Sequence, residues 1–239
     1  MISLSKRNTK HTFPFPKLNG LILILLDSAI KSAWSTILSK PQIQLNSLIE
    51  EKITEKLQKE LQRTLDYEKV TGFNRSIFQN IHRGAKFCSY NDEHLEKQPD
   101  LLIQQIQLRP GINDSRHDAL FIECKILDDL QKSPRLYIED GIRRFVDGEY
   151  AWAMPQAMMI AYIKGNHQLP ESLKTSFLRN FKKINVAKCS PINNEYHLLE
   201  NSIEPKINVT SHERTWEHAK HGKPGQIDLM HIWLDCNQP

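Results

Sequence analysis

The stretch LFIECKIL, residues 120–127, decides how the rest of this sequence is interpreted. Its composition is that of a buried strand, yet Glu123 and Lys125 lie two positions apart within it. Because side chains at positions i and i+2 of a strand share one face, this carboxylate and this ammonium lie side by side. Two charges in a buried strand are costly unless they are paired or bind something. The stretch therefore predicts either a functional site or, on a half-exposed strand, a simple salt bridge.

A second apolar stretch, residues 100–108, begins with Asp100 and precedes the turn sequence RPGIND. If residues 100–108 and 119–127 pair as a hairpin about the midpoint of that turn, the numbers of facing residues sum to 223. Asp100 then faces Glu123, with Cβ atoms about 4.5–5.5 Å apart. Two carboxylates at that distance repel each other unless a cation or a proton lies between them.

Mg²⁺ suits such a pair, because it binds one or two carboxylates and completes its octahedron with waters and phosphate oxygens. We therefore expect Asp100 and Glu123 to hold Mg²⁺, together with the backbone carbonyl of Cys124. Lys125, on the same face, would hold or deprotonate a water, or neutralise charge that grows on a phosphate. The pattern predicts metal-dependent hydrolysis of phosphodiester bonds.

Glu50 is a further candidate, as a metal ligand or as a neighbour of the ligands. The segment 46–66 has apolar residues every four positions and predicts an amphipathic helix, capped by Asn46 or Ser47. At 100° per residue, the apolar stripe centres close to Glu50, which would direct this carboxylate toward the site. The alternative is that Glu50 only lies in the first turn of the helix, where the positive end of the helix dipole favours an acidic side chain.

The remaining pattern predicts a single α/β (α+β) domain, residues 21–239, with a central mixed sheet flanked by helices, an extra N-terminal helix and C-terminal strands. Residues 1–20 are basic and are expected to be poorly ordered or extended. The expected helices are 21–38, 46–66, 137–148 and 169–183, and the expected strands are 100–108, 119–127, 157–163, 195–200, 206–211 and 227–235.

Composition sets broad limits on partners and location. A net charge of +4 and a pI near 8.8 permit a polyanionic partner without requiring one. The four cysteines form no C-x-x-C pair, so we expect reduced thiols and a cytoplasmic protein. The apolar run 21–26 is shorter than a secretory core of about 7–15 residues or a membrane span of about 20, so no membrane association is expected.

The motifs QPDLLI and FIECKIL resemble the PD-(D/E)XK, or restriction-endonuclease-like, nuclease superfamily, whose core order fits residues 47–163. The resemblance implies that Asp100 and Glu123 bind the metal, that Lys125 positions the nucleophilic water, and that Glu50 is the glutamate of the first core helix. It implies a Mg²⁺-dependent endonuclease that Mn²⁺ would also support, acting on DNA (RNA remaining open), of the bacterial defence or restriction type.

The same resemblance leaves two matters open. Double-strand cutting would require a homodimer or a partner subunit, because no separate recognition domain is visible in the sequence. The fold also includes catalytically inactive members, so the alternative is a module that binds nucleic acid or protein without cutting.

Two basic segments are candidates for nucleic-acid contact. In nucleases of this fold, the helix after the lysine strand packs beside the site, so Arg143 and Arg144 would reach a phosphate, or else pair with acids of their own helix. His212 and Arg214 begin a basic segment with further histidines, which predicts a phosphate-facing loop, a solvated loop, or the zinc site of a different hydrolase.

Overall fold

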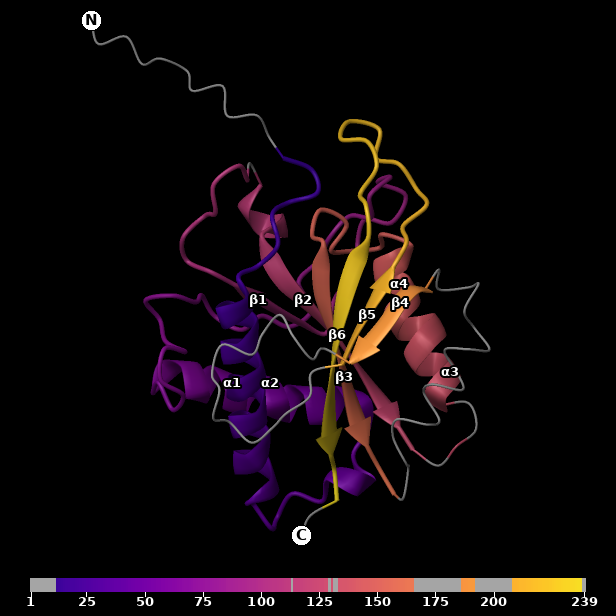
Figure 1. Ribbon diagram of the computed structural model, residues 1–239. Coiled ribbons are helices and arrows are strands. Elements are labelled where there is room, and N and C mark those ends of the chain that lie inside the picture. Colours follow the sequence, from indigo (N-terminus) through magenta and orange to yellow (C-terminus); the bar gives the residue numbers. More distant parts are fainter. Residues whose placement is uncertain are drawn as a thin grey trace, which may run out of the picture.

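The computed structural model describes residues 12–112, 114–128, 130, 133–165, 186–191 and 208–237 (Figure 1). These residues form an α+β structure around a six-stranded mixed sheet of order β1-β2-β3-β6-β5-β4. Strands β2, β3 and β6 are parallel to one another. β1 runs antiparallel to β2, β5 antiparallel to β6, and β4 antiparallel to β5. The strands are β1 Leu101–Gln104, β2 Ala119–Leu127, β3 Gln156–Ile163, β4 Val186–Pro191, β5 Asn208–His212 and β6 Ile227–Asp235.

Helices cover both faces of the sheet (Figure 1). On one face, Trp34 of α1 stacks on Tyr162 of β3 at 5.6 Å, and Thr54 of α2 hydrogen-bonds to the same tyrosine at 3.0 Å. On the other face, Tyr137 of α3 hydrogen-bonds to His231 of β6 at 2.7 Å. The helices are α1 Gly20–Leu38, α2 Glu50–Asp66, α3 Ser133–Tyr137 and α4 Arg143–Val146; α3 and α4 are joined by a π-helical turn, η3 Ile138–Ile142, and short 3₁₀ turns lie at η1 Leu45–Ser47 and η2 Ser115–His117.

Helix α1 combines length and apolar composition to a degree that would also allow it to cross a membrane. In the structure it packs against α2 and β6, and eight of its side chains are buried. A core helix of a globular domain meets the same criteria, and burial of this helix explains why it is apolar around much of its circumference.

The predicted hairpin register is confirmed. Leu101 faces Ile122 and Ile103 faces Leu120, so that facing numbers sum to 223, as the turn sequence predicts. The predicted strands 119–127 and 227–235 match β2 and β6, whereas the first strand ends at Gln104 and not at residue 108. Before this strand, His82 forms an isolated bridge to Leu102 of β1, and Phe78 forms one to Gln105 just after it, so the chain runs beside this edge of the sheet without a regular strand.

The expected helix caps are wrong. Ile49 occupies the N-cap position of α2 and makes no side-chain cap, whereas Asn46 and Ser47 lie within or beside the 3₁₀ turn that precedes it. The predicted helix at 137–148 instead begins at Ser133 and passes through the π-helical turn. Residues 12–19 are extended and packed, with Phe15 donating its backbone N–H to Ala153 at 2.8 Å. The predicted helix 169–183 and strand 195–200 lie outside the described residues.

Candidate active site

The site lies along the edge of β2 beyond the point where β1 begins. Because β1 starts at Leu101, opposite Ile122, the backbone groups of the following β2 residues have no neighbouring strand on that side. Two carboxylates take its place: Asp100 Oδ2 accepts a hydrogen bond from Cys124 N at 2.7 Å, and Glu50 Oε2 accepts one from Ile126 N at 3.0 Å. The N-terminus of α2 and the start of β1 are thereby both fixed to the same strand edge.

Lys125 connects the acidic groups. Its Nζ donates hydrogen bonds to Glu123 Oε1 at 2.9 Å, to Glu50 Oε1 at 3.0 Å and to the carbonyl of Cys124 at 2.9 Å. Burial alone would lower the pKa of Lys125, but the charges of Glu123, Glu50 and Asp100 outweigh that effect and raise it. The side chain is therefore an ammonium at neutral pH, and all three of its donors are used.

Glu123 is fully buried and has three donors around its carboxylate. Lys125 and Arg144 donate to Oε1, the latter at 2.7 Å, and Tyr150 donates its hydroxyl to Oε2. Burial and the nearby charge of Asp100 raise the pKa of Glu123 to about 7, although the Lys125 and Arg144 charges act in the opposite direction. The repulsion between Asp100 and Glu123 that the sequence predicts is therefore present in this geometry.

Tyr150 is a member of the site that sequence reasoning missed. The chain returns to Glu123 after α4 because Gly148 adopts a φ of +70°, a left-handed conformation that favours glycine. The sequence offers one signal, the glycine two positions before the tyrosine, but that signal does not say which strand the tyrosine will face.

A glycine also sets how closely the helical segment approaches the site. A Cβ on Gly141, in the π-helical turn, would lie 2.5 Å from Cε of Met159 and 3.6 Å from Cγ of Lys125. The absence of a side chain lets this turn pack directly on β3 and on the aliphatic stem of Lys125. Beside this contact is a cavity of about 340 Å³, which Glu50, Lys125 and Arg144 all line.

The donor set suits a hard divalent cation in chemical type. Asp100, Glu123, Glu50 and the Cys124 carbonyl offer oxygen atoms only, as Mg²⁺ prefers. In the arrangement observed, the ammonium of Lys125 occupies the space between the carboxylates, and among the described residues no group of three or more His, Cys, Asp and Glu side chains is arranged to hold a metal ion. A metal at this place would require Lys125 to move away from at least one of its carboxylate partners.

The four basic residues expected to contact nucleic acid have different environments. Arg144 contacts Glu123 at the site, and Arg143 is exposed and pairs with Asp147 at 2.8 Å. His212 is fully buried and hydrogen-bonds to Thr210 at 2.7 Å.

Arg214 is also buried. Its guanidinium lies over the ring of Trp216 and donates to the backbone carbonyls of five residues, which compensates for the loss of water. These acceptors are the carbonyls of Ala151, Trp152, Met154, Pro224 and Gly225. Neither His212 nor Arg214 can reach a phosphate in this conformation, because both side chains are buried, contrary to the expectation from the sequence.

Searches against protein-family models, curated proteins and solved structures return no match to this chain.

Proposed function

We propose that this protein is a Mg²⁺-dependent endonuclease that hydrolyses phosphodiester bonds of DNA, with a restriction-endonuclease-like core and a role in bacterial defence. The observation that carries the proposal is the meeting of Asp100, Glu123, Lys125 and Glu50 at one strand edge, from two strands and a helix N-terminus. A salt bridge alone would not need two carboxylates on a single ammonium and a third, Asp100, beside them, because each charge withdrawn from water adds a desolvation cost.

In this function, Asp100, Glu123 and the carbonyl of Cys124 would hold the metal, with Glu50 beside them. The metal, when bound, would polarise a phosphoryl oxygen and lower the pKa of a bound water. Lys125, protonated at neutral pH, would orient the attacking water and offset the negative charge that grows on the phosphate. Arg144, half-exposed beside Glu123, would contact a neighbouring phosphate oxygen.

The test is cleavage by the purified full-length chain of plasmid, single-stranded DNA and RNA, with Mg²⁺, with Mn²⁺ or with EDTA. We expect cleavage of DNA only with a divalent metal. Asp100→Asn keeps an oxygen that can accept from Cys124 N but removes the charge, and it should lower the rate at least about 10²-fold. Asp66→Asn, at the exposed opposite end of α2, is the matched control and should cut within twofold of the unsubstituted protein.

Cleavage that persists in EDTA, or an Asp100→Asn variant that cuts like the control, would contradict the proposal. A homodimer or a partner subunit is expected if both strands of a duplex are cut, and sedimentation of the DNA complex measures its stoichiometry.

A second candidate is a non-catalytic module of the same fold that binds nucleic acid or protein. The observation in its favour is that the Glu123 carboxylate is already satisfied by Lys125, Arg144 and Tyr150, without a metal. Such a module would hold DNA equally well in EDTA and in Mg²⁺ and would not cut it under either condition.

A further inference from the structure

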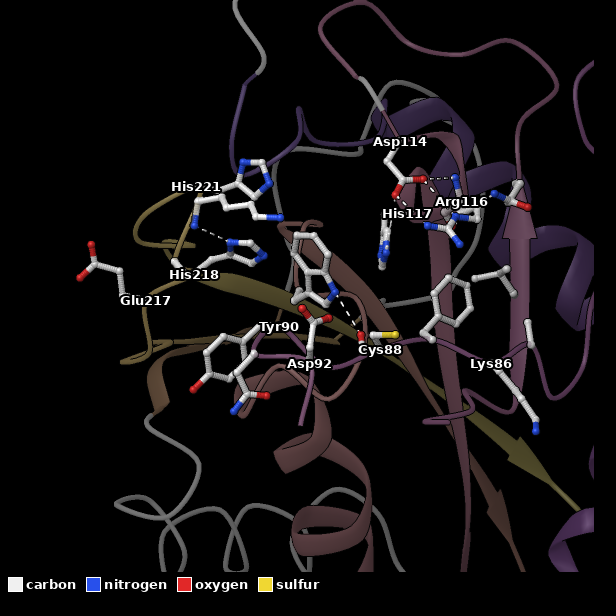
Figure 2. A pocket seen from close by; sticks show the side chains of 18 of the residues that line it. Lys86, Cys88, Tyr90, Asp92, Asp114, Arg116, His117, Glu217, His218 and His221 are labelled. Carbon is white, nitrogen blue, oxygen red and sulfur yellow. Dashed lines mark hydrogen bonds and ion pairs between the residues drawn. The ribbon is translucent and has the colours of Figure 1, made fainter. Parts of the chain in front are cut away.

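A second and larger cavity, of about 740 Å³, lies on the same side of the sheet as the candidate active site. Its walls come from residues 82–92, from the end of β1 and η2, from Trp152, and from the segment 217–221. Figure 2 shows His218, His221 and Tyr90 at one side of this pocket and His117 and Arg116 at the other, with Asp92 between them. Nothing in the proposed chemistry uses these groups.

The pocket begins two residues along the strand from Asp100 and continues to the fourth. Leu102 and Gln104 of β1 line it, and side-chain alternation puts them on the same face as Asp100. At about 3.3 Å per residue, they lie roughly 7 and 13 Å along the strand from Asp100. A polymer whose backbone passes Asp100 therefore has this pocket within reach of its next groups.

A continuous row of rings joins the two sites. Tyr150, which contacts Glu123, stacks at 6.3 Å on Phe121; Phe121 contacts Phe87 at 4.9 Å, and Phe87 contacts His117 at 5.4 Å. The pocket wall is thus packed against the same buried side chains that fix the carboxylate, and the relative position of the two sites is set by this packing.

Aromatic faces dominate the pocket wall. The partly exposed indole of Trp152 lies 4.5 Å from His117 and 4.9 Å from His218, and His218 lies 4.5 Å from His221. The indole is held in place by a hydrogen bond from its Nε1 to the carbonyl of Cys88 at 3.2 Å. Phe13, outside the pocket, packs on part of this wall, with its ring 5.3 Å from His221, 6.0 Å from His218 and 6.2 Å from Trp152. The parts of these rings that line the pocket are flat, fixed π surfaces of the kind on which nucleobases stack.

The charges of the pocket fit a neutral ligand better than a phosphate. Arg116 pairs with Asp114 at 3.4 Å, and Lys86 pairs with Glu96 at 2.7 Å, so two of its cations are already compensated. Asp92 adds a negative charge that a phosphate would meet unfavourably. Hydrogen-bonding groups for a base edge are nevertheless present in the carboxylate of Asp92, the amide nitrogen of Asn91 and Oε1 of Gln104, whereas Asn91 Oδ1 and Gln104 Nε2 bond within the protein.

A zinc site does not explain the histidines. His117 and His218 each contact Trp152, and the described residues contain no cluster of three or more possible ligands arranged for a metal. Burial lowers the pKa of His117 to about 4, so its imidazole is neutral at physiological pH. His117 is buried, so its neutral imidazole helps to hold the indole of Trp152 in place and is not itself a stacking surface.

We propose that this pocket binds an unpaired nucleobase of the substrate, while the adjoining phosphodiester lies at Asp100 and Glu123. The inference rests on the proposed nuclease function and makes it more specific: the substrate presents at least one nucleotide outside the double helix. That nucleotide comes either from a single strand or from a duplex whose base is extruded, at the cost of its unstacking.

Binding in EDTA tests the pocket independently of cleavage. The probes are a labelled single-stranded oligonucleotide, the matching duplex, and that duplex with one unpaired, bulged nucleotide, each measured by fluorescence polarisation. We expect the single strand or the bulged duplex to bind more tightly than the plain duplex. If only the bulged duplex binds tightly, the substrate is a duplex from which a base is extruded. If the single strand and the bulged duplex both bind tightly, the substrate is a single strand.

The double variant His218→Ala/His221→Ala removes two rings from a surface segment and should weaken binding of the unpaired probe about 5- to 100-fold, the range expected for lost base stacking. Trp152→Ala should weaken it further, and circular dichroism shows whether that variant is folded. His94→Ala, an exposed histidine outside the pocket, is the matched control and should bind normally.

Equal binding by the double variant and the control, or no preference for an unpaired nucleotide, would overturn the proposal. This result is distinct from failure of the nuclease function, in which Asp100→Asn cuts normally or no substrate is cut, while the EDTA binding measurements remain interpretable.

Discussion

Glu60, a buried residue of α2, shows how a single carboxylate can connect several segments of the chain. It is buried on α2 and pairs with Lys40 at 2.7 Å, Lys69 at 2.8 Å and Arg63 at 3.3 Å. Burial alone would raise the pKa of Glu60, but hydrogen bonds and charges from Lys40 and Lys69 lower it to about 2. The pKa of a glutamate in an unfolded chain is about 4.3. Between pH 2 and this value, the unfolded chain therefore binds more protons than the folded one.

The stabilisation from Glu60 is therefore present above about pH 4.3 and is lost as the pH falls toward 2. Glu60→Gln should lower the free energy of unfolding by about 2 kcal/mol at pH 7, the scale of hydrogen bonds to charged groups. The difference from the unsubstituted protein should shrink below pH 4, which urea unfolding at pH 7, 5 and 3 measures. Glu55 pairs with Lys52 and Lys59 on the solvent side of the same helix, so Glu55→Gln should change the free energy of unfolding by less than about 0.5 kcal/mol. A loss of stability in Glu60→Gln that does not depend on pH would contradict the role given to the Glu60 charge.

The central residues of the candidate site were predictable because their positions follow from local rules. Strand alternation puts Glu123 and Lys125 on one face, and the turn midpoint puts Asp100 opposite Glu123. Glu50 follows from the position of the apolar stripe on α2, although Ile49, which the stripe includes, is exposed at the N-cap.

Other residues depended on tertiary structure that no local rule describes. Tyr150 reaches Glu123 only because of the path of the chain after α4. Arg214 looked like a surface cation in a basic segment, yet its guanidinium is buried among backbone carbonyls. Composition predicts that arginines are mostly exposed, and the exception is decided by which carbonyls lack other partners.

At the scale of elements, the end of α4 links the candidate active site to the proposed base pocket. The ring of Tyr90 stacks on Trp216 at 4.2 Å, and both rings lie against Gly148. A Cβ at Gly148 would approach each ring to 2.8 Å, and its φ of +70° is unfavourable for any other residue. Gly148 therefore both ends the α4 segment and contacts Tyr90 of the pocket wall.

Gly148→Ala should destabilise the protein by about 2–4 kcal/mol, because backbone strain and overlap with two rings add together. Gly222→Ala is the matched control: its φ is +83°, but nothing lies within 4 Å of an added Cβ, so it carries the strain without the overlap. Urea unfolding of both variants measures the overlap as a difference. If the two variants lose the same stability, the rings do not constrain the end of α4.

The boundaries of elements were less predictable than their existence. The first strand ends at Gln104, whose side-chain amide donates to the carbonyl of Ser115 in η2, so the chain after it turns away from the ladder with β2. The helix after β2 is divided by a π-helical turn at Gly141, where close packing on β3 decides the geometry. Both deviations come from tertiary contacts, which periodicity does not report.

At the scale of the whole molecule, the last strand of the chain lies in the middle of the sheet (Figure 1). β6 pairs with β3 on one side and with β5 on the other, so the two parts of the sheet are joined only when β6 is in place. The sequence predicts these strands as separate apolar stretches, but their order depends on long-range pairing. Buried polar side chains from three elements also meet at this junction.

Thr210 is at the centre of that junction. Its Oγ1 is 2.7 Å from His212 Nε2 and 2.8 Å from His231 Nε2, and His231 Nδ1 is 2.7 Å from the hydroxyl of Tyr137. Burial, together with the nearby His212, lowers the pKa of His231 to about 3, so the imidazole of His231 takes part in this network as a neutral group. It connects β5, β6 and α3, and its loss should be felt across the whole domain.

Thr210→Val tests this junction with almost no change of shape, because both side chains are β-branched and suit a strand. Each imidazole loses one buried hydrogen bond, so the free energy of unfolding should fall by about 2–4 kcal/mol. Thr215→Val, at an exposed position, should change it by less than about 0.5 kcal/mol. Hydrogen exchange followed by mass spectrometry should show faster exchange in β5, β6 and α3 together. Faster exchange confined to β5 would mean that the network is local and that the C-terminal strands are held by backbone pairing and apolar packing alone.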